Sequence, residues 1–328
     1  MPTPPLLNIT VPVFNRPALT LQTLEAVRRS TSVPYVLTVV DNGSDEDTRN
    51  LLIAMRDAGK IDLLIRLDRN YGVAVAANAG WRLVDAPLYM KLDNDVVIHA
   101  PNWFPVVLAE MQRVGKDAVW GADLNGQMGN PAYVHRRQGI TGLTRLHVSG
   151  GAIIIPRSIS ILAGYWSEDY GLYGCEDGDY GERLNALNIH QYYFDHRPFM
   201  RHMGHDATLL KTRHGLDKAQ EKAVFMQLWK VNQFLYKDGH RAPNIPPLYI
   251  PTSFDGYALS LQVNTAGLEI WKAAMDLHNM ADKFRSAPKK SLEVLNHFIT
   301  VQNANWMSAT NAAQDAYERL RVQIAQSL

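Results

Sequence analysis

Apolar segments alternate with amphipathic segments over the first hundred residues of the chain. The apolar segments predict buried strands at 6–14, 35–40, 61–67 and 88–92. Helical spacing predicts helices at 18–29, 44–55 and 73–84, the second of them with a capping box formed by Ser44 and Asp47. This alternation predicts an α/β fold, with a parallel sheet that is covered by helices on both faces.

Polar residues follow four of these predicted strands, namely Asn15, Asp41, Asn70 and Asp93. The carboxyl ends of parallel strands share one edge of a sheet, and ligands of such sheets bind at that edge. A plain structural scaffold has no need of four polar clusters there. We therefore expect a ligand site on this edge.

The segment Asp93-Asn94-Asp95 places two carboxylates two residues apart, directly after an apolar strand. On a continuing strand the two side chains would point the same way and repel each other, so a divalent cation would be needed between them. Oxygen ligands of this kind suit Mg²⁺ or Mn²⁺. The alternative is a solvated turn, since Asp-Asn-Asp is also good turn chemistry. These three residues alone leave both interpretations open.

Two helix starts offer a similar choice. Glycine and alanine in the segment 70–80 allow either a phosphate at the first-turn amides or an ordinary, tightly packed helix. Glu176, Asp177 and Asp179 begin another predicted helix, where acids are favoured by the helix dipole but could also supply a general base. Residues that are two positions apart on a helix are separated by about 200° of rotation, so Asp177 and Asp179 cannot face one site. We expect one to be catalytic and the other structural.

The remainder of the chain predicts further strands and helices and a distinct C-terminal region. Strands are expected at 118–121, 147–155 (with Gly150 and Gly151 inside it) and 191–194, helices at 102–114, 176–187 and 217–236, and loops or a short hairpin at 124–145 and 164–175. A proline-rich linker at 242–251 should lead to helices at 268–284 and 292–324. These helices would pack on the core or form a homo-oligomer with a second copy of the chain.

Composition excludes several classes of protein. A net charge of +1 over 328 residues gives no overall attraction to nucleic acid, although Arg136, Arg137 and the basic run 197–213 permit local contacts. One cysteine excludes an internal disulfide framework and fits a reducing cytoplasm. The start lacks a signal peptide, and no run of about 18 apolar residues predicts an integral membrane segment. We expect a cytoplasmic protein, with peripheral membrane association still open.

The motifs, taken in order, strongly resemble glycosyltransferase family 2 over residues 6–205. They are Val11-Pro12-Val13-Phe14-Asn15-Arg16, Val40-Asp41-Asn42-Gly43-Ser44, the pair Asn-Xaa-Gly and Asn-Xaa-Gly within 70–80, Asp93-Asn94-Asp95, Ser149-Gly150-Gly151-Ala152, Glu176-Asp177 and a late histidine. The resemblance implies the GT-A fold, a nucleotide-sugar donor that is most often a UDP-sugar, and inverting transfer of the sugar to an acceptor hydroxyl.

The resemblance also implies a role for individual residues. Asp41 would contact the base beside Pro12 and Asn15, and Asn70 and Gly72 would flank the nucleoside. Asp93 would lie on the ribose side, and Gly150 and Gly151 would line the donor sugar and the acceptor. The other residues that fall in the nucleotide-sugar motifs are Phe14, Arg16, Asn42, Ser44, Asn78 and Asn94.

Catalysis and metal binding are assigned from the same motifs. Asp177 matches the general base and Glu176 its neighbour in acceptor binding. Asp95 matches the metal ligand that bridges to the diphosphate, and His202 is the late ligand, with His205 as the alternate. Imidazole suits Mn²⁺ better than Mg²⁺, although either histidine could simply be solvated or hydrogen-bonded. Trp166, Tyr170 and Tyr173 could stack on an acceptor sugar or pack in the core.

Two departures limit the resemblance. The Gln-Xaa-Xaa-Arg-Trp motif of processive members is absent, which favours addition of single sugars. The region after Pro243 matches nothing in the family, so the sequence does not identify the acceptor. The acceptor could be a glycan, a lipid-linked molecule or another hydroxyl compound. We expect a GT-A domain at 1–240, with donor binding in 1–98 and the acceptor and catalytic part in 99–240, and a linker and helical region at 241–328.

Three other functions are consistent with some of these features. A nucleotidyltransferase also pairs acids around a metal, but it usually has a basic phosphate loop, and Arg16 is the sole basic residue in the edge motifs. A non-catalytic sugar-nucleotide-binding or assembly subunit would be expected to lose an acid, whereas Asp93, Asp95 and Asp177 are all present. A transferase acting on nucleic acid is disfavoured by the near-neutral charge.

Overall fold

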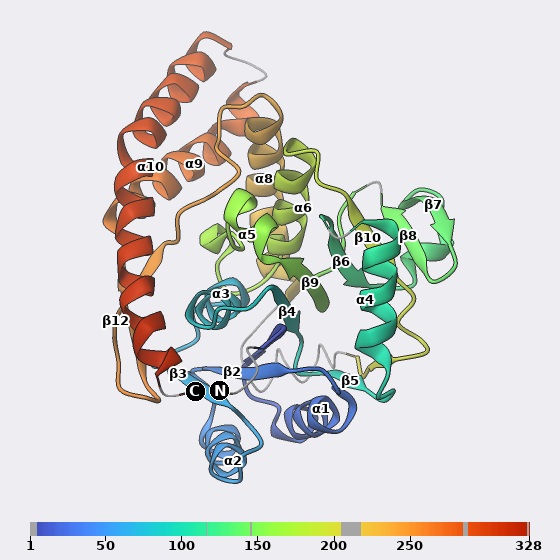
Figure 1. Ribbon diagram of the computed structural model, residues 1–328. Coiled ribbons are helices and arrows are strands. Elements are labelled where there is room, and N and C mark those ends of the chain that lie inside the picture. Colours follow the sequence, from blue (N-terminus) through green and yellow to red (C-terminus); the bar gives the residue numbers. More distant parts are fainter. Residues whose placement is uncertain (1–4, 116, 145, 205–217, 285–287, 327) are drawn as a thin grey trace.

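The computed structural model describes residues 5–115, 117–144, 146–204, 218–284, 288–326 and 328 (Figure 1). A nine-stranded sheet with the order β3-β2-β1-β4-β9-β6-β10-β8-β7 forms its centre. The strands are β1 (Leu7–Val13), β2 (Tyr35–Asn42), β3 (Leu63–Leu67), β4 (Leu88–Leu92), β6 (Val119–Ala122), β7 (Val134–Gln138), β8 (Thr141–Thr144), β9 (Ala152–Pro156) and β10 (Gln191–Phe194). Two small sheets pair β5 (Val96–Ile98) with β11 (Met200–His202) and β12 (Tyr249–Phe254) with β13 (Leu259–Val263).

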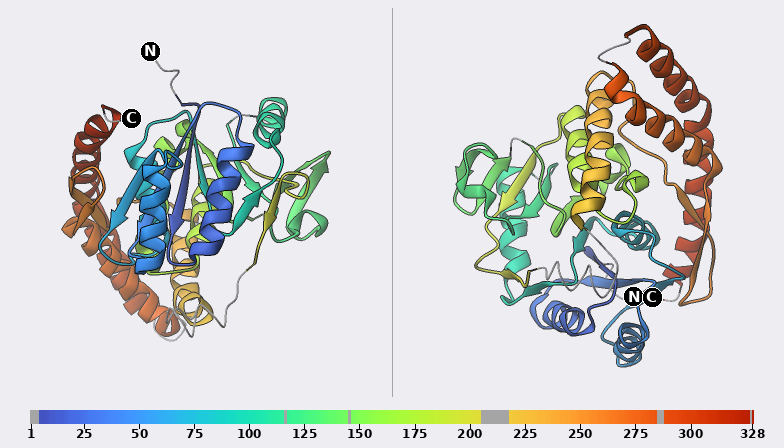
Figure 2. Two further views of the ribbon diagram at one scale, coloured as in Figure 1. Left: turned by 90° about the horizontal axis from the view of Figure 1, so that it is seen from below. Right: turned by 180° about the vertical axis from the view of Figure 1, so that it is seen from behind.

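Helices lie on both faces of the central sheet. They are α1 (Pro17–Ser30), α2 (Glu46–Asp57), α3 (Val73–Leu83), α4 (Trp103–Val114), α5 (Arg157–Ala163), α6 (Glu176–Ala186), α8 (Lys218–Lys237), α9 (Thr265–Phe284) and α10 (Pro288–Ala325), with short 3₁₀ turns at Gln127–Gly129 and Glu168–Tyr170. Figure 2 shows α1 and α2 together on one side, and α10 along the outer margin. The α/β prediction and the mostly parallel sheet are confirmed.

Side-chain alternation along β1 explains the two covered faces. Leu7, Ile9 and Val11 share a buried cluster with Leu24 and Val27 of α1. Asn8 and Thr10 point to the other face, where the Asn8 amide donates to the carbonyl of Gly80 in α3 at 3.0 Å. A Cβ at Gly80 would lie 2.4 Å from Thr10 Cγ2, so only glycine allows α3 to approach this closely.

The direction of β9 places its start at the functional edge. Strands β3, β2, β1 and β4 are mutually parallel, whereas β9 runs antiparallel to β4 with Leu92 opposite Ala152. The backbone N–H of Asp93 therefore donates to the carbonyl of Gly151 at 2.8 Å. The predicted strand at 147–155 is thus shorter than expected, and Gly150 and Gly151 lie just before it.

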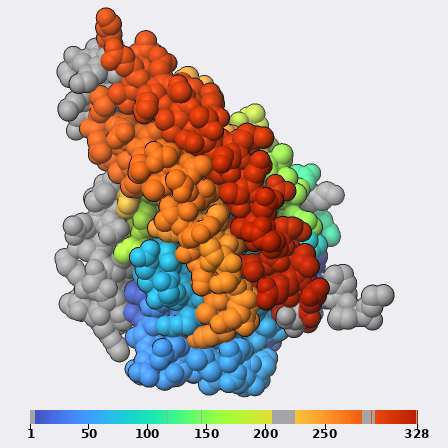
Figure 3. Space-filling view, turned by 90° about the vertical axis from the view of Figure 1, so that its left-hand side faces the viewer, coloured from blue at the N-terminus to red at the C-terminus, as the bar shows by residue number. Residues whose placement is uncertain are grey.

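The C-terminal region packs directly onto the first half of the chain. Phe254, Leu259, Tyr317 and Leu320 form one buried cluster with residues of β2, β3 and α3. Figure 3 shows this orange and red segment lying against the blue N-terminal part. The two predicted C-terminal helices are confirmed as α9 and α10.

Two local predictions are corrected, and one helix was not predicted. Asp45, not Ser44, is the N-cap of α2, and its side chain accepts from the N–H of Thr48 at 3.0 Å. The supposed linker at 242–251 ends inside a hairpin, where Pro251 lies next to a register shift, a usual position for proline in a sheet. Helix α5 was not anticipated, because its few residues after Pro156 show too little periodicity.

Within the described residues, no helix has both the length and the apolar character that crossing a bilayer requires.

Candidate active site

The loops after β1 and β2 are joined to each other through Asn15. Its side-chain oxygen accepts from the N–H of Asp45 at 2.7 Å, and its backbone N–H donates to the Ser44 hydroxyl at 3.0 Å. Asn15 and Arg16 both have left-handed backbones, with φ of 58° and 65°. Such conformations cost free energy in residues other than glycine and persist where the surroundings enforce them. The turn therefore fixes Arg16 beside the end of β4.

Asp41 is fully buried at the end of β2 and carries two contacts. One carboxylate oxygen accepts from the N–H of Ser44 at 2.8 Å, and the other pairs with Arg66 at 2.5 Å. Arg66 lies opposite Asp41 on the neighbouring strand β3. Arg66 was not predicted from the sequence, because its pairing with Asp41 depends on the register between these two strands.

Asn42, Asn70 and Gly72 form the next part of the edge. The Asn42 side chain donates to Asn70 at 2.9 Å and accepts from the N–H of Tyr71 at 2.9 Å. Gly72 has φ of 95°, and a Cβ there would lie 2.1 Å from the carbonyl oxygen of Gly171. The first N–H of α3, that of Val73, donates to the Leu172 carbonyl at 3.3 Å. The first amide of this helix is therefore already used, and the close approach at Gly72 fits the tightly packed interpretation.

Three residues that were assigned to ligands are structural. Asn78 is fully buried and hydrogen-bonds to the backbone of Trp166 and to Glu168. Trp166 is 2 % exposed and packs edge-on against Trp81. Tyr170 is 2 % exposed and donates to Asp179 at 2.7 Å. We correct the predictions that Asn78 binds the nucleotide sugar and that Trp166 and Tyr170 stack on an acceptor, because none of the three presents a free surface.

The segment Asp93-Asn94-Asp95 is a turn between β4 and β5, but it is not a solvated one. The N–H of Val96 donates back to the Asp93 carbonyl at 3.1 Å, and the Asp95 side chain is 1 % exposed. Asn94 donates to the Thr20 hydroxyl at 2.9 Å. The turn directs Asp95 inward, while the side chain of Asp93 remains 32 % exposed.

Asp95 lies between an arginine and a histidine. Arg16 donates to its Oδ2 at 3.0 Å, and Nε2 of His202 lies 3.5 Å from its Oδ1. His202 reaches this position because β11 pairs antiparallel with β5, which places His202 opposite Val96. The hydrogen bond with Asp95 raises the pKa of His202, although partial burial opposes that shift. The alternate ligand, His205, lies outside the described residues.

A divalent cation fits the chemistry of this pair. Carboxylate and imidazole at neighbouring positions are suitable ligands for Mn²⁺. In the part of the chain that the structure describes, no group of three or more histidine, cysteine or acidic side chains gathers around one point. A metal bound by Asp95 and His202 would therefore draw its other ligands from a diphosphate and from water.

Lys91 and Gly150 connect the first acidic cluster to the second. Lys91 is 2 % exposed, and its amine donates to Asp93 and, at 2.8 Å, to the Gly150 carbonyl. The N–H of Gly150 donates to Asp177 at 3.1 Å. A Cβ at Gly150 would lie 2.5 Å from the ring of Trp166, and one at Gly151 would lie 3.3 Å from Asp93 Oδ2. Lys91 was not predicted from the sequence, where its position two residues before Asp93 is the only signal of this role.

The acids at the start of α6 have different environments. Burial, together with the neighbouring charge of Asp177, raises the pKa of Glu176 to about 7. Asp177 accepts from the N–H groups of both Gly150 and Gly178. Asp179 points away into the core, where it pairs with Arg183 at 2.9 Å. The prediction that Asp177 and Asp179 face different sites is confirmed.

Tyr173 lies close to these acids. Burial raises the pKa of its hydroxyl, and the charges of Glu176, Asp93, Asp177 and Asp95 raise it further. Of the three aromatic residues assigned to the acceptor, it is the one that the structure brings to the site. Pro12 and Phe14 flank Val13 at the end of β1, on the same edge.

Comparison with known proteins identifies the family of part of the chain and supports the type of fold. Residues 8–166 match the family model described as glycosyl transferase family 2, so this part of the chain is a member of that family. A mannosyltransferase from Pyrobaculum calidifontis, solved with GDP-Man and Mn²⁺, superposes over 99% of this chain and 85% of its own, with a TM-score of 0.50 and 12% identity. That likeness supports the GT-A type of α/β fold.

Particular relatives are similar over shorter segments. Validoxylamine A glucosyltransferase of Streptomyces hygroscopicus subsp. limoneus is 37% identical over 107 residues, which are 32% of this chain and 23% of that protein. An undecaprenyl-phosphate 4-deoxy-4-formamido-L-arabinose transferase of Serratia proteamaculans is 31% identical over 125 residues, 37% of each chain. The match thus spans well under half the length of these curated relatives.

Proposed function

We propose that the chain is a metal-dependent, inverting glycosyltransferase, which moves one sugar from a nucleoside-diphosphate sugar to an acceptor hydroxyl. The observation that carries the proposal is the pairing of two acidic clusters across the Gly150-Gly151 backbone. Asp93 contacts this backbone through Lys91 and through its own N–H, and Asp177 contacts it at the N–H of Gly150. A donor and an acceptor that meet at these glycines would lie between the two clusters.

The donor would lie along the edge formed by the ends of β1, β2 and β4. Asp41 and Asn15 would receive the base, Asn70 the nucleoside and Asp93 the ribose. Asp95 and His202 would hold a divalent cation, which would neutralise charge on the leaving diphosphate. Arg16, held 3.0 Å from Asp95, adds a positive charge at the same point. UDP is our choice of nucleotide because the family most often uses it.

Asp177 would act as the general base. Two backbone N–H groups orient its carboxylate, and the buried neighbour Glu176, with a pKa of about 7, holds its own proton up to near neutrality. Two neighbouring acids with different environments can divide the roles of proton holder and proton acceptor. Asp177 would take the proton of the acceptor hydroxyl while the oxygen of that hydroxyl attacks the anomeric carbon. The bond to the diphosphate breaks on the opposite face, and its electron pair leaves with the diphosphate.

The named activities of the relatives suggest the kind of acceptor. One is named for validoxylamine A and another for undecaprenyl phosphate. We propose a hydroxyl-bearing acceptor of glycan, small-molecule or lipid-linked type, bound by the part of the chain after residue 98 and covered in part by Tyr173. The single cysteine fits a reducing compartment such as the cytoplasm.

Thermal unfolding with a panel of nucleoside diphosphates, with and without Mn²⁺ or Mg²⁺, tests donor binding. A ligand that binds only the folded state raises its stability with concentration. We expect one nucleotide to raise Tm only when the metal is present. No shift with any nucleotide would contradict the assigned donor site.

The variant Asp177→Asn separates binding from catalysis. It should keep the nucleotide shift but lose transfer from the donor that binds. Asp179→Asn is an unsuitable control because it would break a buried ion pair, so Asp47→Asn, on the exposed first turn of α2, serves instead. Transfer that survives in Asp177→Asn would move the role of base to Glu176.

A further inference from the structure

A cavity of about 280 Å³ lies where α10 meets α3, α5 and the segment 244–247. Its lining includes Arg82, Tyr165, Thr310, Tyr317 and Arg321. The cavity is partly open to solvent, and its volume has room for several water molecules. That is the size of a phosphate with a small organic group attached.

Arg82 supplies a buried cation whose hydrogen-bonding capacity is not used up. The residue is 9 % exposed, and its Nε has no hydrogen-bond partner within the described residues. Its guanidinium carbon lies 4.0 Å from the ring centre of Tyr165 and 5.0 Å from that of Tyr317. Aromatic faces attract the charge but do not accept conventional N–H hydrogen bonds. The guanidinium is thus held in place while its Nε donor has no partner.

The buried acid near the cavity, Glu168, does not accept a hydrogen bond from Arg82. Buried Glu168 is close enough for Arg82 to oppose the rise that burial causes in its pKa. Yet the carboxylate of Glu168 accepts from Asn78, Leu248 and Tyr249 rather than from this arginine. Glu168 therefore balances the charge of Arg82 and leaves its Nε donor unpaired.

Two more groups face the same cavity. Arg321 donates to the Arg82 carbonyl at 3.1 and 3.2 Å, and its other nitrogen pairs with Glu318 at 3.3 Å. The Glu318 side chain is 61 % exposed, so this pair is screened by water and easily replaced. The hydroxyl of Thr310 is also buried without a partner in the described chain.

We propose that this cavity binds a small oxyanion, either a phosphorylated or a carboxylated metabolite, between Arg82 and Arg321. Both residues line the cavity, and a guanidinium group matches the geometry of both kinds of oxyanion. The site is separate from the proposed donor site, since Arg82 lies ten residues after Gly72 along α3, or roughly 15 Å at the rise of an α-helix. The inference does not depend on the proposed transferase activity.

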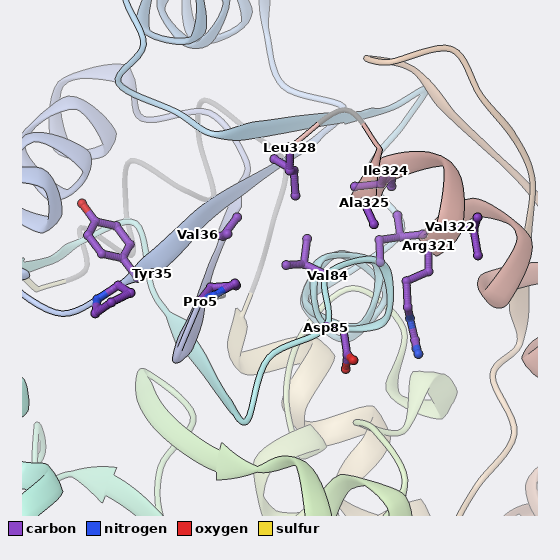
Figure 4. A pocket seen from close by; sticks show the side chains of 12 residues that line it. Pro5, Tyr35, Val36, Val84, Asp85, Arg321, Val322, Ile324, Ala325 and Leu328 are labelled. Carbon is purple, nitrogen blue, oxygen red and sulfur yellow. The ribbon is translucent and has the colours of Figure 1, made fainter. Parts of the chain in front are cut away.

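A neighbouring hollow offers a contrast. Figure 4 shows it lined by Pro5, Val36, Val84 and Leu328, with Arg321 at its margin. This lining is mainly apolar and includes one arginine, whereas the lining of the first cavity includes both Arg82 and Arg321. The oxyanion is therefore assigned to the side of Arg321 that faces Arg82.

The test measures binding of inorganic phosphate, glucose 6-phosphate and citrate at constant ionic strength, with a chelator present so that no metal brings phosphate to the donor site. Calorimetry and thermal unfolding of the full chain are the readouts. We expect saturable binding of at least one probe. If citrate alone binds, the ligand is a carboxylated metabolite. If inorganic phosphate or glucose 6-phosphate binds, the ligand is a phosphorylated one.

Charge variants on α10 assign the binding to this cavity. Arg321→Gln should weaken binding about tenfold, as expected from the loss of a charged hydrogen-bonding partner. Arg319→Gln makes the same charge change on an exposed residue of α10 and should bind as the wild type does. Glu318→Gln removes the competing acid and should tighten binding without affecting folding.

Three outcomes would overturn the proposal. The first is that none of the three probes binds saturably at millimolar concentration. The second is that Arg319→Gln weakens binding as much as Arg321→Gln, which would mean a general charge effect. The third is that Glu318→Gln leaves the affinity for the probe unchanged or lowers it. This result can be interpreted even if Arg321→Gln fails to fold.

Discussion

The variant Lys91→Met tests whether the link across Gly150 sets the geometry of the active site. Methionine keeps the apolar stem of the side chain beside Trp166, where the amine now lies 5.0 Å from the ring centre. It removes the donor to Asp93 and to the Gly150 carbonyl. The change therefore isolates the ammonium group.

The magnitude follows from burial. The lysine side chain is 3 % exposed, but that of Asp93 is 32 % exposed, so water can replace the lysine at the aspartate and not at the Gly150 carbonyl. Leaving one buried acceptor unpaired costs about 1–3 kcal/mol of unfolding free energy. Movement of Gly150 would also displace Asp177, which its N–H holds. A displacement of about 1 Å can lower the rate of transfer about a hundredfold.

Urea unfolding and steady-state transfer kinetics measure the two effects. Lys272→Met, an exposed lysine paired with Glu269 on α9, is the matched control and should change neither. We expect kcat of Lys91→Met to fall far more than the Kd for the donor nucleotide rises. A folded Lys91→Met protein with wild-type kcat would refute the idea that this amine positions Gly150 and Asp177.

Further variants test the other assignments. Asp95→Asn should abolish the metal-dependent part of nucleotide stabilisation, measured as the Tm difference with and without Mn²⁺; an unchanged difference would contradict its role as metal ligand. The pKa of Glu176 is raised from 4.5 to about 7, so the folded state holds a proton that the unfolded chain releases, and stability should fall as the pH rises through this window. Glu176→Gln cannot ionise and should therefore raise Tm more at pH 8 than at pH 5, and equal gains would refute the shift. Tyr170→Phe should lower stability by about 1–3 kcal/mol, because Asp179 loses a buried donor, while KM for the acceptor stays unchanged.

Periodicity and motif order were sufficient to predict the fold and the sheet edge that carries the candidate site. The first strands and helices have strong apolar patterns, and their alternation determines which strand ends meet. The pairing of Asp41 with Arg66 depends on the register between β2 and β3, which a single sequence does not specify. Lys91 was missed because its partner, the Gly150 carbonyl, lies just before β9, a strand that is far along the chain and runs antiparallel to β4.

Aromatic residues near the site were the least predictable. Trp166 and Tyr170 belong to a glycine-rich loop that could have pointed either outward or inward. Their direction is set by Asn78, which fixes the backbone of Trp166, and by Asp179, which accepts from Tyr170. Such polar contacts link residues that are distant in sequence and have no local pattern.

The packing of α10 on α3 has a consequence for synthesis of the protein on the ribosome. Leu63, Ile65 and Leu67 of β3 are buried with Tyr317 and Leu320, about 250 residues later in the chain. At a translation rate of about 5–20 residues per second, this apolar surface stays uncovered for roughly 12–50 seconds after it is made. During that interval the nascent chain presents a strand edge and an apolar helix to its surroundings, and we expect it to need chaperones that a finished molecule does not.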